Sequence, residues 1–180
     1  EHSILRRTRS DIRVVPLKQS DLRAKGVYTR DVDKLASTEF TFTRFLVPHL
    51  NEYKGWAVFC DSDMVFLMDA VSLFDNLDPT LAVYCVQHDY NPPEGLKMDG
   101  QIQTQYPRKN WSSMMIFNCE HPSTQQLTVE RVNTATGAYL HRFEWCDDSE
   151  IGVLDCSYNW LVGHYTEGTD GTPKILHYTE

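Results

Sequence analysis

The sequence lacks paired cysteines: its five cysteines are scattered over 180 residues, and none belongs to a C-x-x-C pair. Structural zinc sites usually take their ligands from such short spacings, so a site of that class is not expected. An odd number of cysteines with apolar neighbours indicates free buried thiols in a reducing compartment. We therefore expect a cytoplasmic protein, with peripheral attachment to the inner face of a membrane as the alternative.

Long apolar runs and an excess of basic residues are lacking as well. No apolar run approaches the roughly 20 residues of a membrane-spanning helix, so no transmembrane segment is expected. With 17 Lys and Arg against 25 Asp and Glu, the net charge is −8. This charge disfavours a nucleic-acid partner, because binding to phosphates requires a cationic face.

Short β-rich apolar runs alternate with helical patterns along the chain. Strands are expected at residues 12–17, 56–60, 81–86, 113–118 and 175–178, and helices at 37–50 and 123–134. This alternation predicts a single α/β domain, residues 1–180, with a mostly parallel central sheet. Ligands of such sheets bind beyond the carboxyl ends of the strands.

Two carboxylates follow the apolar run WAVFC (residues 56–60), which is typical of a strand buried on both faces. Asp61 and Asp63 lie at positions i and i+2, where side chains of an extended chain point the same way. Two neighbouring carboxylates repel unless a proton or a cation lies between them. Oxygen ligands suit Mg²⁺ or Mn²⁺, which could act as a Lewis acid on a departing nucleotide diphosphate. The alternative is an ordinary acidic turn after a strand.

Four segments together resemble, in order, the conserved blocks of glycosyltransferases with a GT-A fold, and most closely bacterial proteins related to glycosyltransferase family 8. They are STEFTFTRFLVPHL, GWAVFCDSDMVFL, YPRKNWSSMMIFNC and PKILHYTE. The family's first strand and the segment that follows its late histidine have no counterpart here. The resemblance therefore implies a GT-A domain that lacks its first strand, with truncation at both ends left open.

The resemblance also implies roles around the carboxylate pair. Asp61 and Asp63 match the aspartates that bind the metal and the sugar nucleotide, and His177 matches the histidine that completes the metal site. Arg44 matches an arginine that contacts the donor, since a guanidinium suits phosphates and sugar hydroxyls. The alternatives are a plain histidine at a strand end and an arginine on a helix surface.

Other matching positions concern the two substrates. Residues lining the donor-sugar pocket are implied at four positions: Asn110, Trp111, Ser112 and Ser113. Asp147 and Asp148 are implied as catalytic acids near the acceptor and the reacting carbon, with ordinary solvated acids as the alternative. Asn159 and Trp160 match a block that shapes the acceptor side or packs Trp160 into the core.

The function that follows from the resemblance is metal-dependent transfer of a hexose from a nucleotide-diphosphate sugar, UDP-linked, to an acceptor hydroxyl. Mn²⁺ or Mg²⁺ is the expected cofactor, and retention of the anomeric configuration is the expected outcome. The acceptor would be a glycan, a lipid-linked sugar or another hydroxyl compound in glycan or polysaccharide synthesis. A catalytically incomplete nucleotide-binding fragment and a metal-dependent nucleotidyltransferase remain the alternatives.

Overall fold

The central sheet of the molecule has mixed strand directions. The computed structural model describes residues 1–8, 10–31, 41–88, 95–96, 102–103, 108 and 110–179. In this part of the chain, four strands pair in the order β1-β6-β3-β7: β1 (Trp56–Cys60), β6 (Met114–Asn118), β3 (Val83–Val86) and β7 (Ile151–Leu154). β6 runs antiparallel to β1 and β3, whereas β3 and β7 are parallel.

The α/β class is thus confirmed, but the expectation of a mostly parallel sheet is wrong. The reason lies in the connections. Met114 at the start of β6 pairs with Cys60 at the end of β1, so β6 enters the sheet at the edge where β1 and β3 end. A chain that returns at the same edge must run antiparallel, because a parallel pair requires a crossover to the opposite edge.

A second, smaller sheet lies against the first. It contains β2 (Met64–Phe66), β9 (Ile175–His177) and β8 (Trp160–Leu161) in the order β2-β9-β8. β2 and β9 are antiparallel, and Met64 pairs with His177. This register brings His177, the last residue of β9, next to the acidic turn that precedes β2. A further short pair is formed by β4 (Gly95–Leu96) and β5 (Ile102–Gln103).

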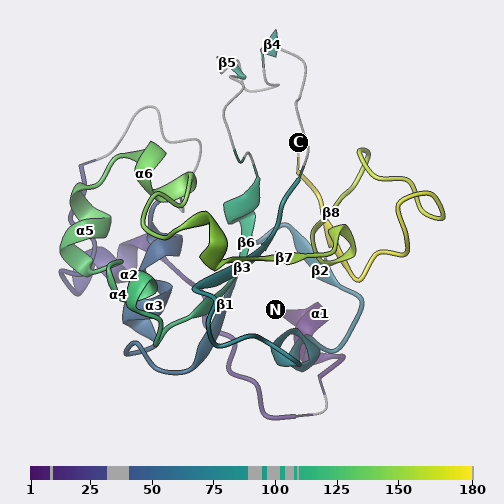
Figure 1. Ribbon diagram of the computed structural model, residues 1–180, viewed down its shortest axis with the longest axis horizontal. Coiled ribbons are helices and arrows are strands. Elements are labelled where there is room, and N and C mark those ends of the chain that lie inside the picture. Colours follow the sequence, from purple (N-terminus) through teal and green to yellow (C-terminus); the bar gives the residue numbers. More distant parts are fainter. Residues whose placement is uncertain are drawn as a thin grey trace.

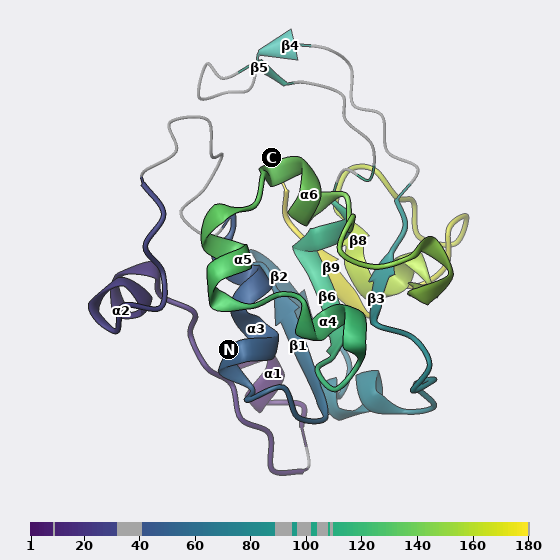
Figure 2. The same ribbon diagram turned by 60° about the vertical axis from the view of Figure 1, so that its left-hand side comes forward.

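The helices are short. The α-helices are α1 (His2–Leu5), α2 (Gln19–Ala24), α3 (Val47–Leu50), α4 (Pro122–Gln125), α5 (Val129–Thr134) and α6 (Gly137–His141). The 3-10 helices are η1 (Thr43–Leu46), η2 (Ala70–Phe74), η3 (Trp111–Ser113), η4 (Asp148–Glu150) and η5 (Cys156–Asn159). Helices α2 to α6 gather on one side of the central sheet, and α1, β2 and β8 lie on the other (Figures 1 and 2).

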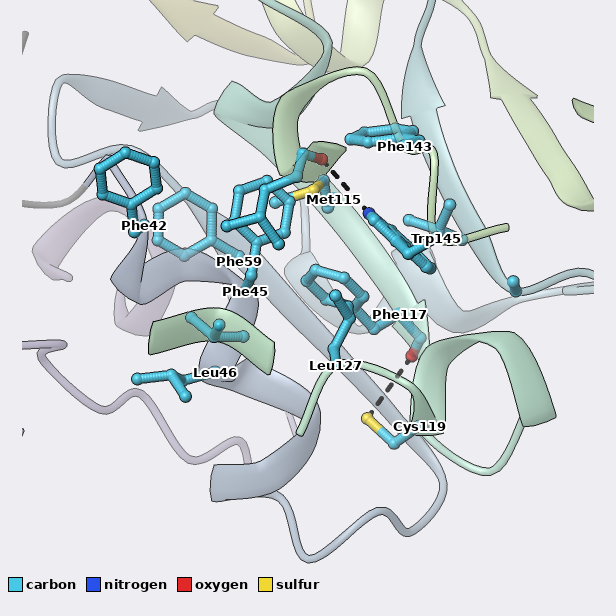
Figure 3. Close-up of a cluster of buried hydrophobic side chains, with 14 of the residues drawn as sticks. Phe42, Phe45, Leu46, Phe59, Met115, Phe117, Cys119, Leu127, Phe143 and Trp145 are labelled. Atoms are coloured by element: carbon cyan, nitrogen blue, oxygen red, sulfur yellow. Dashed lines mark hydrogen bonds between the residues drawn. The ribbon is translucent and has the colours of Figure 1, made fainter. Parts of the chain in front are cut away.

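Strand β6 is buried on both faces and separates two hydrophobic clusters. Met115 and Phe117 belong to the larger cluster, which α3, α5 and α6 cover, whereas Met114 and Ile116 belong to the cluster under β2 and β9. Figure 3 shows Phe117 of the larger cluster between Phe45 and Trp145. Each fully buried side chain of this size stabilises the fold by about 1.5–3 kcal/mol.

Several elements differ from those expected from the sequence. Residues 12–17 form no strand, and Pro16 has no backbone N–H to give to a sheet. The expected helix at 37–50 begins outside the described residues; its later part is η1 followed by α3, with Pro48 in the first turn of α3, where proline is tolerated. The helix expected at 123–134 is divided into α4 and α5, because Thr128 accepts a hydrogen bond from the Arg131 N–H and starts a new helix there.

Candidate metal centre

The candidate site lies at the sheet edge where β1, β3 and β7 end and β6 begins. Asp61 directly follows β1, and its backbone N–H donates to the Ser113 carbonyl over 2.9 Å. The Asp63 carbonyl accepts from the Tyr178 N–H over 3.1 Å. The first bond ties the acidic turn to the start of β6, and the second ties it to the chain just after β9. The turn is therefore held by both sheets.

Asp61, Asp63 and His177 form a compact group of ligand atoms. One carboxylate oxygen of each aspartate and one imidazole nitrogen all lie within 4.8 Å of one another. In the described part of the chain, no other set of three acidic, histidine or cysteine side chains meets this geometry. Two carboxylates with one imidazole are a donor set that fits a divalent cation such as Mn²⁺ or Mg²⁺. The structure thus brings together the three residues that the sequence singled out as metal ligands.

The two aspartates have different electrostatic surroundings. Burial raises the pKa of Asp61, and the neighbouring Asp63 adds to this, while Arg44 and His177 counteract it. Burial also acts to raise the pKa of Asp63, but the contact with the His177 imidazole outweighs it and holds that pKa below its ordinary value. The distance from His177 Nε2 to Asp63 Oδ1 is 3.4 Å. A divalent cation would lower the pKa of both carboxyls by direct attraction.

Arg44 lies inside the site and not on a helix surface. Its Nη2 forms an ion pair with Asp61 Oδ1 at 3.0 Å, and its Nη1 donates to the Ser112 carbonyl over 2.8 Å. The guanidinium also lies 4.9 Å from the centre of the Phe59 ring. Arg44 is 7% exposed. The guanidinium group of Arg44 therefore connects the acidic turn to the segment before β6. Its contact with a sugar-nucleotide donor stays a prediction.

The segment predicted to line the donor pocket lies beside this ion pair. Asn110 adopts a left-handed backbone conformation (φ 64°), which asparagine tolerates better than most residues. The Trp111 indole donates to the His88 carbonyl over 3.3 Å. Ser112 Oγ lies 2.8 Å from His141 Nδ1, and Ser113 Oγ donates to the Asn110 carbonyl over 2.6 Å. The structure places these four residues at the same sheet edge as Asp61.

The two aspartates predicted as catalytic acids lie elsewhere. They precede β7, whose first residue pairs with the start of β3 at the edge opposite Asp61. Asp147 forms a capping box with Glu150 at the start of η4. Asp148 forms an ion pair with Arg108 at 2.5 Å, and its side chain is 82% exposed. The structure does not bring Asp147 or Asp148 into the group of Asp61, Asp63 and His177.

Two further buried side chains lie at the site: Asn159, which the sequence linked to the acceptor side, and His88, which it did not single out. Asn159 contacts His177 Nδ1 through Oδ1 at 2.9 Å and donates from Nδ2 to Ser113 Oγ over 2.8 Å. His88 Nδ1 lies 2.8 Å from Tyr165 Oη, and no described residue forms a hydrogen bond with its buried Nε2. Burial lowers the pKa of His88 to about 3, helped by the charges of His177 and His164. The signal in the sequence was the position of His88 just after a strand.

Two solved structures with a similar fold are described as glycosyltransferases. WbbM, described as a bifunctional glycosyltransferase, is 19% identical with a TM-score of 0.57, and the match covers 86% of this chain and 33% of WbbM. The glycosyltransferase GlyE of Streptococcus pneumoniae TIGR4 is 15% identical with a TM-score of 0.52, over 90% of this chain and 44% of GlyE. The fold is therefore a GT-A fold, and the chain spans less than half of either protein.

The family of the chain is identified by its similarity to a plant protein. Protein CDI of Arabidopsis thaliana is 51% identical, and the match covers 99% of this chain and 70% of that protein. The chain belongs to the family of Protein CDI. No protein-family model matches the chain. Among the described residues, no helix combines the length and the apolar character needed to cross a membrane.

Proposed function

We propose that this domain is a metal-dependent glycosyltransferase that moves a hexose from a nucleotide-diphosphate sugar, UDP-linked, to an acceptor hydroxyl. The observation that carries the proposal is the group of Asp61, Asp63 and His177 at the carboxyl edge of a GT-A sheet. Ligands of α/β sheets bind at this edge. The fold shared with two glycosyltransferases supports the same reaction class.

The residues at this edge have different roles in the proposed reaction. Asp61, Asp63 and His177 would hold Mn²⁺ or Mg²⁺, which when bound neutralises charge that develops on the leaving diphosphate. Arg44 holds Asp61 through its ion pair and keeps that half-buried carboxylate oriented toward Asp63 and His177. The segment from Asn110 to Ser113 would orient the donor sugar. Catalysis is then mainly positioning of two substrates.

Stereochemistry and acceptor belong to the proposal as well. Retention is the expected outcome, by a route in which the leaving group assists the acceptor on the same face of the sugar. Asp147 is engaged as a helix cap and Asp148 in an ion pair, so neither supports a nucleophile at this site. The acceptor class is a hydroxyl of a glycan, a lipid-linked sugar or another compound.

Substitution of the aspartates tests the proposal. Release of UDP from UDP-glucose and UDP-galactose in the presence of Mn²⁺ is measured for Asp61→Asn, Asp63→Asn and the control Asp11→Asn, which changes an exposed aspartate. Turnover falls at least about 100-fold in the first two variants. Loss of a residue that only hydrogen-bonds a metal ligand already lowers activity by up to about 100-fold, and these variants change a ligand itself. The control keeps wild-type turnover.

Two results would contradict the proposal. One is turnover in Asp61→Asn and Asp63→Asn that stays close to wild type while both variants remain folded by circular dichroism. The other is release of hexose 1-phosphate in place of UDP, which indicates a nucleotidyltransferase.

A further inference from the structure

The carbonyl of Asn110 begins a chain of hydrogen bonds that leads to His177. Ser113 Oγ donates to this carbonyl over 2.6 Å. A carbonyl oxygen can only accept, so the hydroxyl hydrogen of Ser113 is committed to this bond. Toward its other neighbour, Ser113 Oγ can therefore act only as an acceptor.

That other neighbour is the side-chain amide of Asn159. The amide atom 2.8 Å from Ser113 Oγ must carry hydrogen, which identifies it as Nδ2. Oδ1 is then the amide atom that faces His177 Nδ1 at 2.9 Å. Because Oδ1 can only accept, Nδ1 must be protonated. The direction of every bond in the chain is thus set by a backbone carbonyl.

The consequence concerns the other nitrogen of His177. In a neutral imidazole with hydrogen on Nδ1, Nε2 carries the lone pair. Nε2 faces Asp63 Oδ1 at 3.4 Å. Two acceptors lie stably side by side only when a cation or a proton is between them. The chain therefore presents Nε2 as a ligand atom in the group with Asp61 and Asp63.

Burial protects this arrangement. Asn159 is fully buried, and Ser113 and His177 are 4% and 3% exposed, so water has little access to the bonds between them. Hydrogen bonds in such surroundings are stronger, and a misdirected donor costs more than in water. Asn159 is itself fixed as the last residue of η5, whose first turn is capped by Asp155 Oδ1 accepting from the Ser157 N–H.

We infer that Asn159 is a positioning residue that fixes the Nδ1–H tautomer of His177 and thereby directs Nε2 at a divalent cation, an inference that rests on the metal site of the proposed function. Ser113 and Asn110 orient the Asn159 amide. The segment assigned to the donor pocket and the metal ligand His177 are in this way parts of one hydrogen-bonded unit.

The tautomer is tested first, without metal. Nitrogen-15 spectra of the imidazoles are recorded for the 180-residue chain at alkaline pH, above the ordinary titration range of imidazole. Wild type and Asn159→Asp, which keeps an acceptor at this position, show His177 with hydrogen on Nδ1. Asn159→Leu loses this preference. Hydrogen on Nε2 in the wild type, or an unchanged tautomer in Asn159→Leu, would overturn the inference.

Metal affinity is tested next by titration with Mn²⁺. Asn159→Leu binds Mn²⁺ about 10- to 100-fold more weakly than wild type, and Asn159→Asp recovers most of the loss. Asn118→Leu is the matched control: Asn118 is also buried and donates to the Pro79 and Leu81 carbonyls, but it lies at the opposite end of β6. This control is destabilised yet binds Mn²⁺ within twofold of wild type.

The two parts of the test separate the two proposals. If the wild type binds no Mn²⁺, the metal-dependent function fails, and the tautomer spectra still decide whether Asn159 sets the state of His177. If the wild type binds Mn²⁺ and Asn159→Leu binds it equally well, the positioning role is wrong while the metal site stands.

Discussion

His141 is a buried imidazole beside the segment that precedes β6. It ends α6, its ring meets Phe45 edge-on with ring centres 5.1 Å apart, and Nδ1 lies 2.8 Å from Ser112 Oγ. Burial lowers its pKa from 6.5 to about 3, and the charge of Arg44 acts in the same direction. The folded protein therefore holds this ring neutral under conditions where the unfolded chain protonates it.

This difference predicts an acid-dependent loss of stability. The folded pKa lies below the unfolded one, so the unfolded state takes up a proton first and stability falls as the pH drops below about 6.5. From pH 7.5 to 5.5, His141 accounts for about 1 kcal/mol of the fall in the free energy of unfolding. Urea titrations at both pH values measure this loss.

A matched pair of variants isolates the effect. His141→Gln loses about 1 kcal/mol less than wild type between these pH values, since glutamine does not titrate. His2→Gln, which changes an exposed histidine, keeps the wild-type difference. An unchanged pH difference in His141→Gln would show that this ring is protonated in the folded state.

At the residue scale, the sequence predicted that Asp61, Asp63 and His177 lie together, but not what orients the His177 side chain. Asp61 and Asp63 stand directly after an apolar strand, a position visible in the sequence, and His177 was found through the resemblance of the last block. The role proposed for Asn159 depends on which amide atom faces Ser113, and that depends on a hydrogen bond between residues 46 positions apart. No local pattern carries this information.

At the element scale, the pairing of β3 with β7 places the Tyr84 ring over Gly152. A Cβ added to Gly152 would lie 2.3 Å from Cδ1 and 2.8 Å from Cγ of Tyr84. The Tyr84 ring cannot simply swing away, since its Oη accepts from the Asp78 N–H over 2.7 Å and its ring packs against Trp56. The glycine thus allows the parallel pairing of β7 with β3.

Gly152→Ala is therefore expected to lower the free energy of unfolding by about 1–3 kcal/mol, the usual cost of overpacking. Val153→Thr, at a neighbouring position that is 65% exposed, changes stability by less than about 0.5 kcal/mol. In a Tyr84→Ala background, the cost of Gly152→Ala falls to near zero. Denaturant unfolding measures all three, and an equal cost with and without the Tyr84 ring would contradict this account.

The sequence predicted the strands better than their directions. The apolar runs at β1, β3, β6 and β9 were visible because each is rich in β-branched, aromatic or long apolar residues. The direction of β6 depends on the edge at which the chain re-enters the sheet, which is a property of the connection between residues 87 and 113 and not of the strand itself. The alternation of strands and helices therefore predicted the α/β class correctly and the strand directions of the central sheet incorrectly.

At the scale of the whole molecule, the candidate site exists only where the two sheets meet. Asp61 follows a strand of the four-stranded sheet, and His177 belongs to β9 of the three-stranded sheet. The backbone bond from Tyr178 to Asp63 and the bond from Asn159 to Ser113 connect the two. The group of Asp61, Asp63 and His177 therefore forms only when the two sheets are packed together.

Calorimetric titration of the chain with UDP, with Mn²⁺ present and then with EDTA, tests the central claim most directly. The account predicts that UDP binds to the wild-type chain when Mn²⁺ is present and that EDTA abolishes this binding. It also predicts that Asp63→Asn does not bind UDP even when Mn²⁺ is present. Equal binding with and without the metal, or no binding in either condition, would contradict a metal-dependent nucleotide-diphosphate site at Asp61, Asp63 and His177.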